Sequence, residues 1–300
     1  MKRYITSAYN KFLCPERGKS INNRQRGKKQ MDNKELYQLL GMPEVVKERL
    51  LFYGNSRIIS ISDNLFNRLM HRNEWDEAVK DLQELLGEDP DGIKILWELL
   101  NLACIYTYPK YLECNISEDI FVDTMKFCTR FLNEHFSYFG SYKFVWAWWF
   151  PRQISFNEFR IGALEYEFVD GENREIAIHI PSDADMSIES VLKSMEDFYL
   201  FRQTYFPQWD NIQLTCDSWM LMPQLSDLLG NGSNIVTFQK LFKIDSIDYD
   251  ATWYMGWIYP GFELINDSLP EGTTLQRKLK NYLLEGKKFG IAKGHLIYKS

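Results

Sequence analysis

The stretch from Phe159 to Pro223 constrains the fold of this chain more than any other, because it predicts two strands, a helix and a further strand in direct succession. The first strand covers 159–168 and leads into an Asp-Gly turn at 170–171, which is a common hairpin connection. The second strand covers 176–180 and stops at Pro181, since proline cannot donate to a sheet ladder.

A helix predicted within 182–203 links these strands to the last one, at 212–222. Its apolar side chains recur at 3.6-residue spacing: Ile188, Val191, Leu192, Met195, Phe198 and Tyr199. A strand–helix–strand unit of this length predicts a right-handed crossover between parallel strands. Ligands of such units bind beyond the carboxyl ends of the strands. Five polar or aromatic side chains fall at those ends: His179, Ser182, Asp183, Ser218 and Trp219.

The rest of the chain divides by composition. Between Asn33 and Phe136 the apolar residues recur at helical spacing, whereas from Ser141 the chain becomes aromatic and β-prone. Two later segments, 234–244 and 252–259, are predicted as further strands. We therefore predict an α+β protein, in which a helical N-terminal domain precedes a mixed β-sheet domain with flanking helices. The expected parts are a disordered basic tail over 1–30, the helical domain over 31–152 and the sheet domain over 153–300.

Charge and cysteine content limit the partners. Residues 31–300 hold 26 basic and 40 acidic residues, and their net charge of −14 disfavours nucleic acid. No apolar run is long enough to span a bilayer, so we expect no membrane segment. Five cysteines without a C-x-x-C pair, and with no metal-ligand spacing to the four histidines, predict a reduced cytoplasmic protein without a metal.

His179 is the strongest single candidate for chemistry, because it ends a strand and precedes Pro-Ser-Asp. A neutral imidazole there can take a proton from an incoming amine or hydroxyl. Asp183 is expected to orient the ring, with Glu165 as the other candidate, and a histidine that merely bonds a turn is the competing interpretation. Cys216 or Ser218 can be a nucleophile only beside His179, and the apolar neighbours of Cys216 favour a buried thiol.

Glu165 and Glu167 share one face of the first strand. Two carboxylates at this spacing can form an acid–base pair, because crowding raises the pKa of one of them; the alternative is that both lie on a solvent-exposed face. The hairpin loop decides which residue lies opposite His179. A four-residue loop places Leu164 there, and one residue more places Glu165 there, so both registers stay open.

The order of elements resembles that of GNAT-type acyltransferases. Four segments, FRIGALEYEF, IHIPSDADMS, CDSWMLMPQL and SNIVTFQKLFKI, are similar to segments of a bacterial family of acyltransferase-domain proteins. Its members join a helical N-terminal domain to a GNAT-like C-terminal domain, and the resemblance covers Met31 to Tyr298. It implies acyl-CoA or another pantetheine thioester as co-substrate. The side chains expected to line the substrate site are Ser182, Cys216, Ser218, Trp219 and Glu167.

One loop departs from the pattern that the resemblance implies. GNAT enzymes usually grip the CoA pyrophosphate with an R/Q-x-x-G-x-G/A loop at a helix N-terminus. The matching loop here, 181–185, has no glycine or arginine and contains Asp183 and Asp185, which would repel a pyrophosphate. Either CoA is held in another way, or the donor is a different pantetheine carrier, or transfer activity has been lost.

The sequence thus predicts an enzyme that moves an acyl group from a CoA-type thioester to an amine or hydroxyl acceptor by direct attack, with His179 as general base. The partners are a small-molecule donor and acceptor. Two alternatives stay open: a non-catalytic ligand-binding protein on a GNAT-like scaffold, and a hydrolase built on Glu165 and Glu167.

Overall fold

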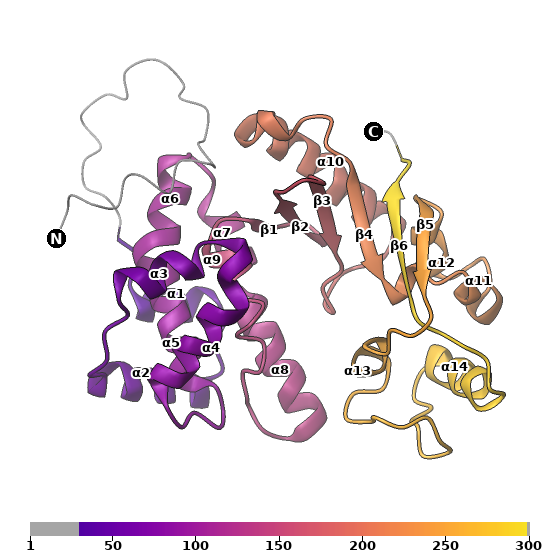
Figure 1. Ribbon diagram of the computed structural model, residues 1–300, viewed down its shortest axis with the longest axis horizontal. Coiled ribbons are helices and arrows are strands. Elements are labelled where there is room, and N and C mark those ends of the chain that lie inside the picture. Colours follow the sequence, from indigo (N-terminus) through magenta and orange to yellow (C-terminus); the bar gives the residue numbers. More distant parts are fainter. Residues whose placement is uncertain (1–29, 299–300) are drawn as a thin grey trace.

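The computed structural model describes residues 30–298, so the predicted basic tail lies outside the described residues apart from its last position. A helical region comes first and occupies the left of Figure 1. Its elements are α1 (Asn33–Leu39), α2 (Glu44–Ser56), α3 (Asp63–Leu69), η1 (Arg72–Glu74), α4 (Trp75–Leu86), α5 (Ile93–Leu102), η2 (Ala103–Thr107), α6 (Tyr108–Glu113), α7 (Glu118–Met125), α8 (Phe127–Phe139) and α9 (Pro151–Ile154).

Side-chain caps fix where several of these helices begin. Asp32, Ser62 and Ser117 each accept a hydrogen bond from the backbone N–H three residues ahead, at the starts of α1, α3 and α7. Gly87 ends α4 at a φ of +65°. Between α3 and α4 the short helix η1 carries Arg72, whose side chain reaches the sheet.

The described chain continues into a six-stranded sheet with the order β1-β2-β3-β4-β6-β5 (Figure 1). Its strands are β1 (Glu158–Ile161), β2 (Leu164–Val169), β3 (Glu175–His179), β4 (Leu214–Ser218), β5 (Phe242–Asp248) and β6 (Ile291–Leu296). The helices around it are α10 (Ile188–Tyr205), η3 (Pro207–Trp209), η4 (Trp219–Leu221), α11 (Gln224–Leu229), α12 (Asn234–Gln239), α13 (Tyr254–Ile258) and α14 (Thr274–Leu284). The predicted α+β class is therefore confirmed. Within residues 30–298 no helix is long and apolar enough to cross a membrane.

The predicted helical connection between parallel strands is confirmed, because β3 and β4 are parallel and α10 joins them. The segment 159–168, however, is not one strand. Gly162 adopts a φ of +63° and reverses the chain between β1 and β2, a conformation that glycine tolerates at little cost. The β2–β3 register then places Glu165 directly opposite His179, which decides between the two open registers.

Two predicted strands are helices in the structure. Residues 234–239 form α12 and only 242–248 form β5, whereas a strand was predicted over 234–244. The burial of Val236 and Phe238 mimics strand alternation, but the helical turn lets Gln239 donate to the carbonyls of Met220 and Met222, both at 2.8 Å. The predicted strand over 252–259 is the helix α13.

The first three strands have one apolar face and one charged face, because successive side chains alternate. On the apolar face Tyr166 stacks on Phe198 of α10 with ring centroids 3.9 Å apart. The charged face, which carries Glu158, Glu167 and His179, meets the helical region. The aromatic segment 142–150 leads into this junction as turns rather than as the β structure that its composition predicted.

Strands β3 and β4 pair over a short distance. Ile176 lies opposite Leu214 and Ala177 lies opposite Thr215, but both strands continue beyond these pairs. Their backbone groups nearer the carboxyl ends are therefore not joined to each other. His179 ends β3 beside this unpaired stretch.

Candidate functional site

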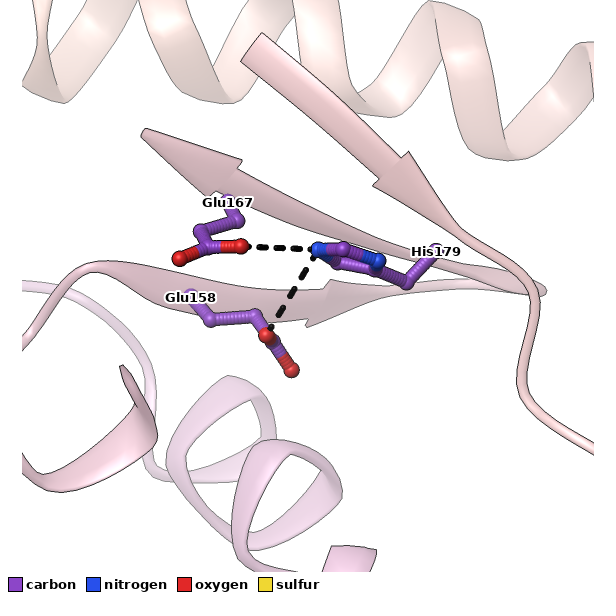
Figure 2. A group of neighbouring side chains, drawn as sticks. All are labelled: Glu158, Glu167 and His179. Atoms are coloured by element: carbon purple, nitrogen blue, oxygen red, sulfur yellow. Dashed lines mark hydrogen bonds and ion pairs between the residues drawn. The ribbon is translucent and has the colours of Figure 1, made fainter. Parts of the chain in front are cut away.

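Three carboxyl groups are buried where the sheet meets the helical region. Glu158, Glu165 and Glu167 are 1%, 4% and 2% exposed, although carboxylates are seldom buried without partners. The alternative that placed Glu165 and Glu167 on a solvent-exposed face is therefore wrong. All three project from the face opposite α10, as does His179 of β3, and Figure 2 shows how the imidazole faces Glu158 and Glu167.

His179 is held by Glu167. Its Nε2 lies 2.9 Å from Oε2 of Glu167 and 3.9 Å from Oε2 of Glu158. Because an ionised carboxylate can only accept, Nε2 must carry the hydrogen, which leaves a lone pair on Nδ1 of the neutral ring. Nδ1 points away from both carboxyl groups in Figure 2 and has no hydrogen-bond partner among residues 30–298. The side chain is 25% exposed, so Nδ1 is the atom that a substrate can approach.

Two arginines keep Glu167 ionised. Arg72 of η1 ion-pairs with Oε1, and Nε of Arg152 in α9 lies 3.3 Å from the same oxygen. Burial acts to raise the pKa of Glu167, but the hydrogen bond from His179 and the three positive charges outweigh it and hold this pKa well below its ordinary range. Burial acts in the opposite sense on His179, where the bond to Glu167 and the surrounding carboxylates prevail and raise the pKa. The imidazole is thus a stronger base than a free histidine.

Glu158, unlike Glu167, favours the neutral form. Nε2 of Gln153 donates to its Oε1 at 2.6 Å, and Nε1 of Trp149 donates to its Oε2 at 3.2 Å. Burial raises the pKa of Glu158 well above its ordinary range, against the opposing charge of His179. The site therefore holds one carboxyl group that favours the neutral form beside another that is ionised, a division typical of acid–base sites.

Trp149 also fixes the orientation of the imidazole. Its ring meets the ring of His179 edge to face, with centroids 4.9 Å apart and an interplanar angle of 85°. On Trp149 lies the guanidinium of Arg152, 3.9 Å from the ring centroid. Hydrogen bond, aromatic contact and cation thus restrict the rotation of His179.

The carboxylates that were predicted to orient His179 are paired elsewhere. Glu165 lies opposite His179 in the sheet, but its oxygens accept from Arg130 of α8 at 2.9 and 3.4 Å. Asp183 accepts from Arg160 at 2.9 Å. The prediction that Asp183 or Glu165 orients the base is therefore wrong: the arginines draw both carboxylates away, and Glu167 makes this contact.

The other predicted site residues surround this centre less closely. Ser182 donates to Glu134 of α8, and Ser218 accepts from the Met220 N–H at 3.1 Å at the start of η4, where Trp219 is half-buried. Cys216 projects from the apolar face of β4, opposite to the face of His179, and burial raises the pKa of its thiol far above its ordinary range. Both facts exclude Cys216 as a nucleophile activated by His179; substrate contacts of these side chains stay a prediction.

Ligand atoms of Glu158, Glu167 and His179 lie within 4.8 Å of one another, a spacing that suits a divalent cation. The surroundings do not suit one. Arg72 and Arg152 already neutralise Glu167, and Glu158 favours its protonated form, which binds metals poorly. The residues fit a hydrogen-bonded acid–base cluster better than a metal centre.

Sequence reasoning missed Glu158, Arg72 and Arg152. Glu158 stood outside the predicted strand, which was taken to begin one residue later, and so its place on the face of Glu167 was not seen. Arg72 precedes Glu167 by 95 residues in the chain. No local pattern marks such a contact, since it depends on how the helical region docks on the sheet.

Models of two protein domains match this chain. The model described as a GNAT-like C-terminal domain matches residues 159–296, and the model described as an N-acyltransferase N-terminal domain matches residues 31–156. No curated protein matches the chain.

Solved acyltransferase structures share its fold. A mutant acyltransferase in complex with octanoyl-CoA aligns with a TM-score of 0.70 and 17% identity, over 88% of this chain and 86% of that chain. An acyltransferase in complex with decanoyl-CoA and teicoplanin gives 0.60 and 18%, over 89% and 99%. A complex with decanoyl-CoA gives 0.64 and 16%, over 90% and 100%. With both domain models matched in order, the chain belongs to the acyltransferase family that joins an N-acyltransferase N-terminal domain to a GNAT-like C-terminal domain.

Proposed function

We propose that this protein transfers an acyl group from a medium-chain acyl-CoA to an amine or hydroxyl acceptor by direct attack, with His179 as the general base. The observation that carries the proposal is the oriented His179–Glu167 pair at the carboxyl end of β3, beside the unpaired stretch of β3 and β4. Solved relatives with this fold were captured with octanoyl-CoA and decanoyl-CoA, which supports the choice of donor.

The unpaired stretch suits a thioester donor. The pantetheine arm of CoA contains two amide groups, and the free backbone groups of diverging strands can pair with them as a further strand would. This position brings the thioester to the end of β3, next to His179. Direct attack needs no covalent enzyme intermediate, so the inaccessible thiol of Cys216 is no obstacle to it.

In the chemical step the two ring nitrogens of His179 have different roles. Nδ1 of His179 takes a proton from the acceptor nitrogen or oxygen while that atom bonds to the thioester carbonyl carbon. The carbon–sulfur bond then breaks, and CoA leaves as a thiolate that is protonated to the thiol. Glu167 stabilises the imidazolium through Nε2, as an ionised partner does for other catalytic histidines.

The loop after β3 repels CoA phosphates less than its sequence predicts. The charge of Asp183 is neutralised by Arg160, and Asp185 accepts from the N–H of Ser187, the N-cap residue of α10, at 2.9 Å. Both acidic groups are therefore engaged within the protein. A pocket of about 580 Å³ opens here, and both cations (Arg160 and Lys193) and carboxylates (Asp183, Asp185 and Glu189) line it.

The two alternatives have weaker support. A carboxylate-pair hydrolase needs a free pair of carboxyl groups, whereas Glu165 and Glu167 are each bound to arginine. A non-catalytic binding protein has no need of a strongly oriented base with an open nitrogen. Acyl transfer accounts for both features.

Binding of the donor tests the proposal first. Octanoyl-CoA at about 100 times its Kd should stabilise the fold by about 2.7 kcal/mol and raise Tm by roughly 5 °C or more. The His179→Ala variant is the matched control and should show the same shift, because the base is not needed to hold the donor. Wild type should then release CoA thiol with primary amines or alcohols, and the variant should not. An unchanged Tm in wild type would contradict acyl-CoA as the donor.

A further inference from the structure

The helix α9, together with Trp149 just before it, provides three of the side chains that surround the proposed base. Trp149 meets the imidazole of His179, whereas Arg152 and Gln153 each bind one carboxyl group of the cluster. Yet α9 has only 4 residues. A helix of this length is not stable by itself, so its position depends on contacts with the rest of the protein.

One hydrogen bond joins the end of α9 to the helical region. Oγ1 of Thr107 donates to the carbonyl oxygen of Ile154, the last residue of α9, at 2.7 Å. Both residues are buried, and among residues 30–298 this carbonyl accepts no other hydrogen bond. The carbonyls of 151–153, by contrast, accept from backbone N–H groups of 155–157. Thr107 is thus the hydrogen-bonding link between this end of α9 and the helical region.

The backbone around Thr107 is not a regular helix. Thr107 ends η2, a π-helical turn between α5 and α6 in which the N–H of Tyr108 donates to the carbonyl of Ala103, five residues back. Pro109 follows and has no N–H, so a continuous α-helix would leave one carbonyl of this turn without its donor. Such π-helical turns are rare and are frequent at functional sites.

The hydroxyl of Thr107 also differs from other threonine hydroxyls in helices of this protein. Those of Thr124 and Thr237 donate to the carbonyl four residues earlier, at 2.7 and 3.1 Å, which is the usual bond of a threonine inside a helix. Thr107 instead donates to Ile154, 47 residues later in the chain. Its hydroxyl therefore joins two segments of the protein rather than one turn of a helix.

We propose that Thr107 is a positioning residue, which acts through α9 on the orientation of His179 and its carboxylate partner. The inference rests on the proposed acyl transfer. While the hydrogen bond fixes α9, Trp149 stays against the imidazole and Arg152 stays beside the carboxylate. Without the hydroxyl, the buried carbonyl of Ile154 loses its partner, and α9 must shift to reach another donor or water. The proposed role needs no contact between Thr107 and the donor, so donor binding should not change.

Thr107→Val tests this role, because valine has nearly the same shape and lacks the hydroxyl. With octanoyl-CoA and hexylamine, kcat per folded molecule should fall about tenfold or more, since small displacements of catalytic groups are costly. KM for octanoyl-CoA should stay within about twofold of wild type. Thr107→Ser restores the hydroxyl and should recover most of kcat. Thr237→Val is the control: it removes a hydroxyl-to-carbonyl bond in α12 and should leave kcat unchanged.

Thr107→Ala replaces the valine variant if that variant is not recovered folded. Its smaller side chain leaves space for a water molecule at the carbonyl of Ile154. Water satisfies this carbonyl but does not fix its position, so the same loss of kcat and the same unchanged KM are expected.

An NMR measurement makes the test independent of turnover. The Nε2–H signal of His179 is identified by its absence from His179→Ala. In Thr107→Val this proton should exchange with water about tenfold faster than in wild type, because local opening beside a loosened Trp149 is more frequent. It should exchange at the wild-type rate in Thr107→Ser and in Thr237→Val.

Three results would overturn the positioning role: a wild-type kcat in Thr107→Val, equal losses of kcat in Thr107→Val and Thr107→Ser, or an exchange rate of the His179 proton that does not change in Thr107→Val. A wild type that transfers no acyl group would instead refute the proposed transfer. The exchange rates alone would then decide whether Thr107 positions His179.

Discussion

Replacing His179 with alanine is expected to lower kcat by about 10²–10⁴-fold, the usual cost of losing a general base. The fold should survive, because Glu167 keeps its pairs with Arg72 and Arg152. KM for octanoyl-CoA should barely change, since Nδ1 acts on the acceptor. The measurement is the turnover of octanoyl-CoA and hexylamine, normalised to the folded fraction of each preparation.

Glu167→Gln is the matched variant, because it keeps the base and removes the charge of its partner. The pKa of His179 is raised in the wild type, so the acidic limb of kcat/KM should lie above the ordinary pKa of histidine. Without the carboxylate this pKa falls, and the limb should move to lower pH. The loss in kcat should be smaller than for His179→Ala, since the amide oxygen can still accept from Nε2.

The pH dependence of the free energy of unfolding is a second test of the His179–Glu167 pair. A raised folded pKa means that His179 adds stability that is fully present below the unfolded pKa and is lost as pH rises through the folded pKa. The difference in free energy of unfolding between wild type and His179→Ala should therefore be largest at acidic pH and shrink toward alkaline pH.

The turnover of His179→Ala decides whether His179 takes part in the mechanism. A loss of turnover within about threefold of wild type, far below the loss expected on removing a general base, would remove His179 from the mechanism.

Local patterns in the sequence were enough to predict the crossover and the end of β3. Alternation, a proline and a helical stripe identified β3, α10 and β4, and the carboxyl-end rule singled out His179. These signals are local, because each element must bury its apolar side chains whichever neighbour it packs against. The same reasoning mistook α13 for a strand, because Trp253, Met255 and Trp257 alternate, although Tyr254, Met255 and Ile258 are the residues that one helix face buries.

The partner of His179 could not be found in this way. The residue directly opposite His179 is Glu165, yet His179 donates its hydrogen bond to Glu167, its diagonal neighbour. Side chains of this length reach diagonal positions in a sheet, so the register alone does not decide between them. Which glutamate contacts His179 depends on Arg130 and Arg72, because each of them binds one of the two glutamates. Both arginines belong to the helical region. The acid–base cluster is therefore a product of the docking of the two regions.

Replacing Arg130 with methionine is expected to lower the free energy of unfolding by about 3 kcal/mol, because it leaves a buried carboxylate without its main partner. Arg130 and Glu165 are 9% and 4% exposed, and their closest contact is 2.9 Å. Among the described residues Arg160, at 3.9 Å, remains near Glu165 after the change. Urea unfolding at pH 7 measures the loss.

The double variant Arg130→Met/Glu165→Met distinguishes the net stabilisation by the ion pair from the destabilisation caused by leaving one of its charges unpaired. Two apolar side chains of similar volume leave no charge buried, so the double variant should be more stable than Arg130→Met alone. Lys193→Met breaks the exposed pair with Asp197 and should change stability little, which controls for the loss of a lysine or arginine charge in general. If Arg130→Met unfolds at the urea concentration of wild type, Glu165 does not depend on Arg130, and the helical region must be held to the sheet by its apolar contacts instead.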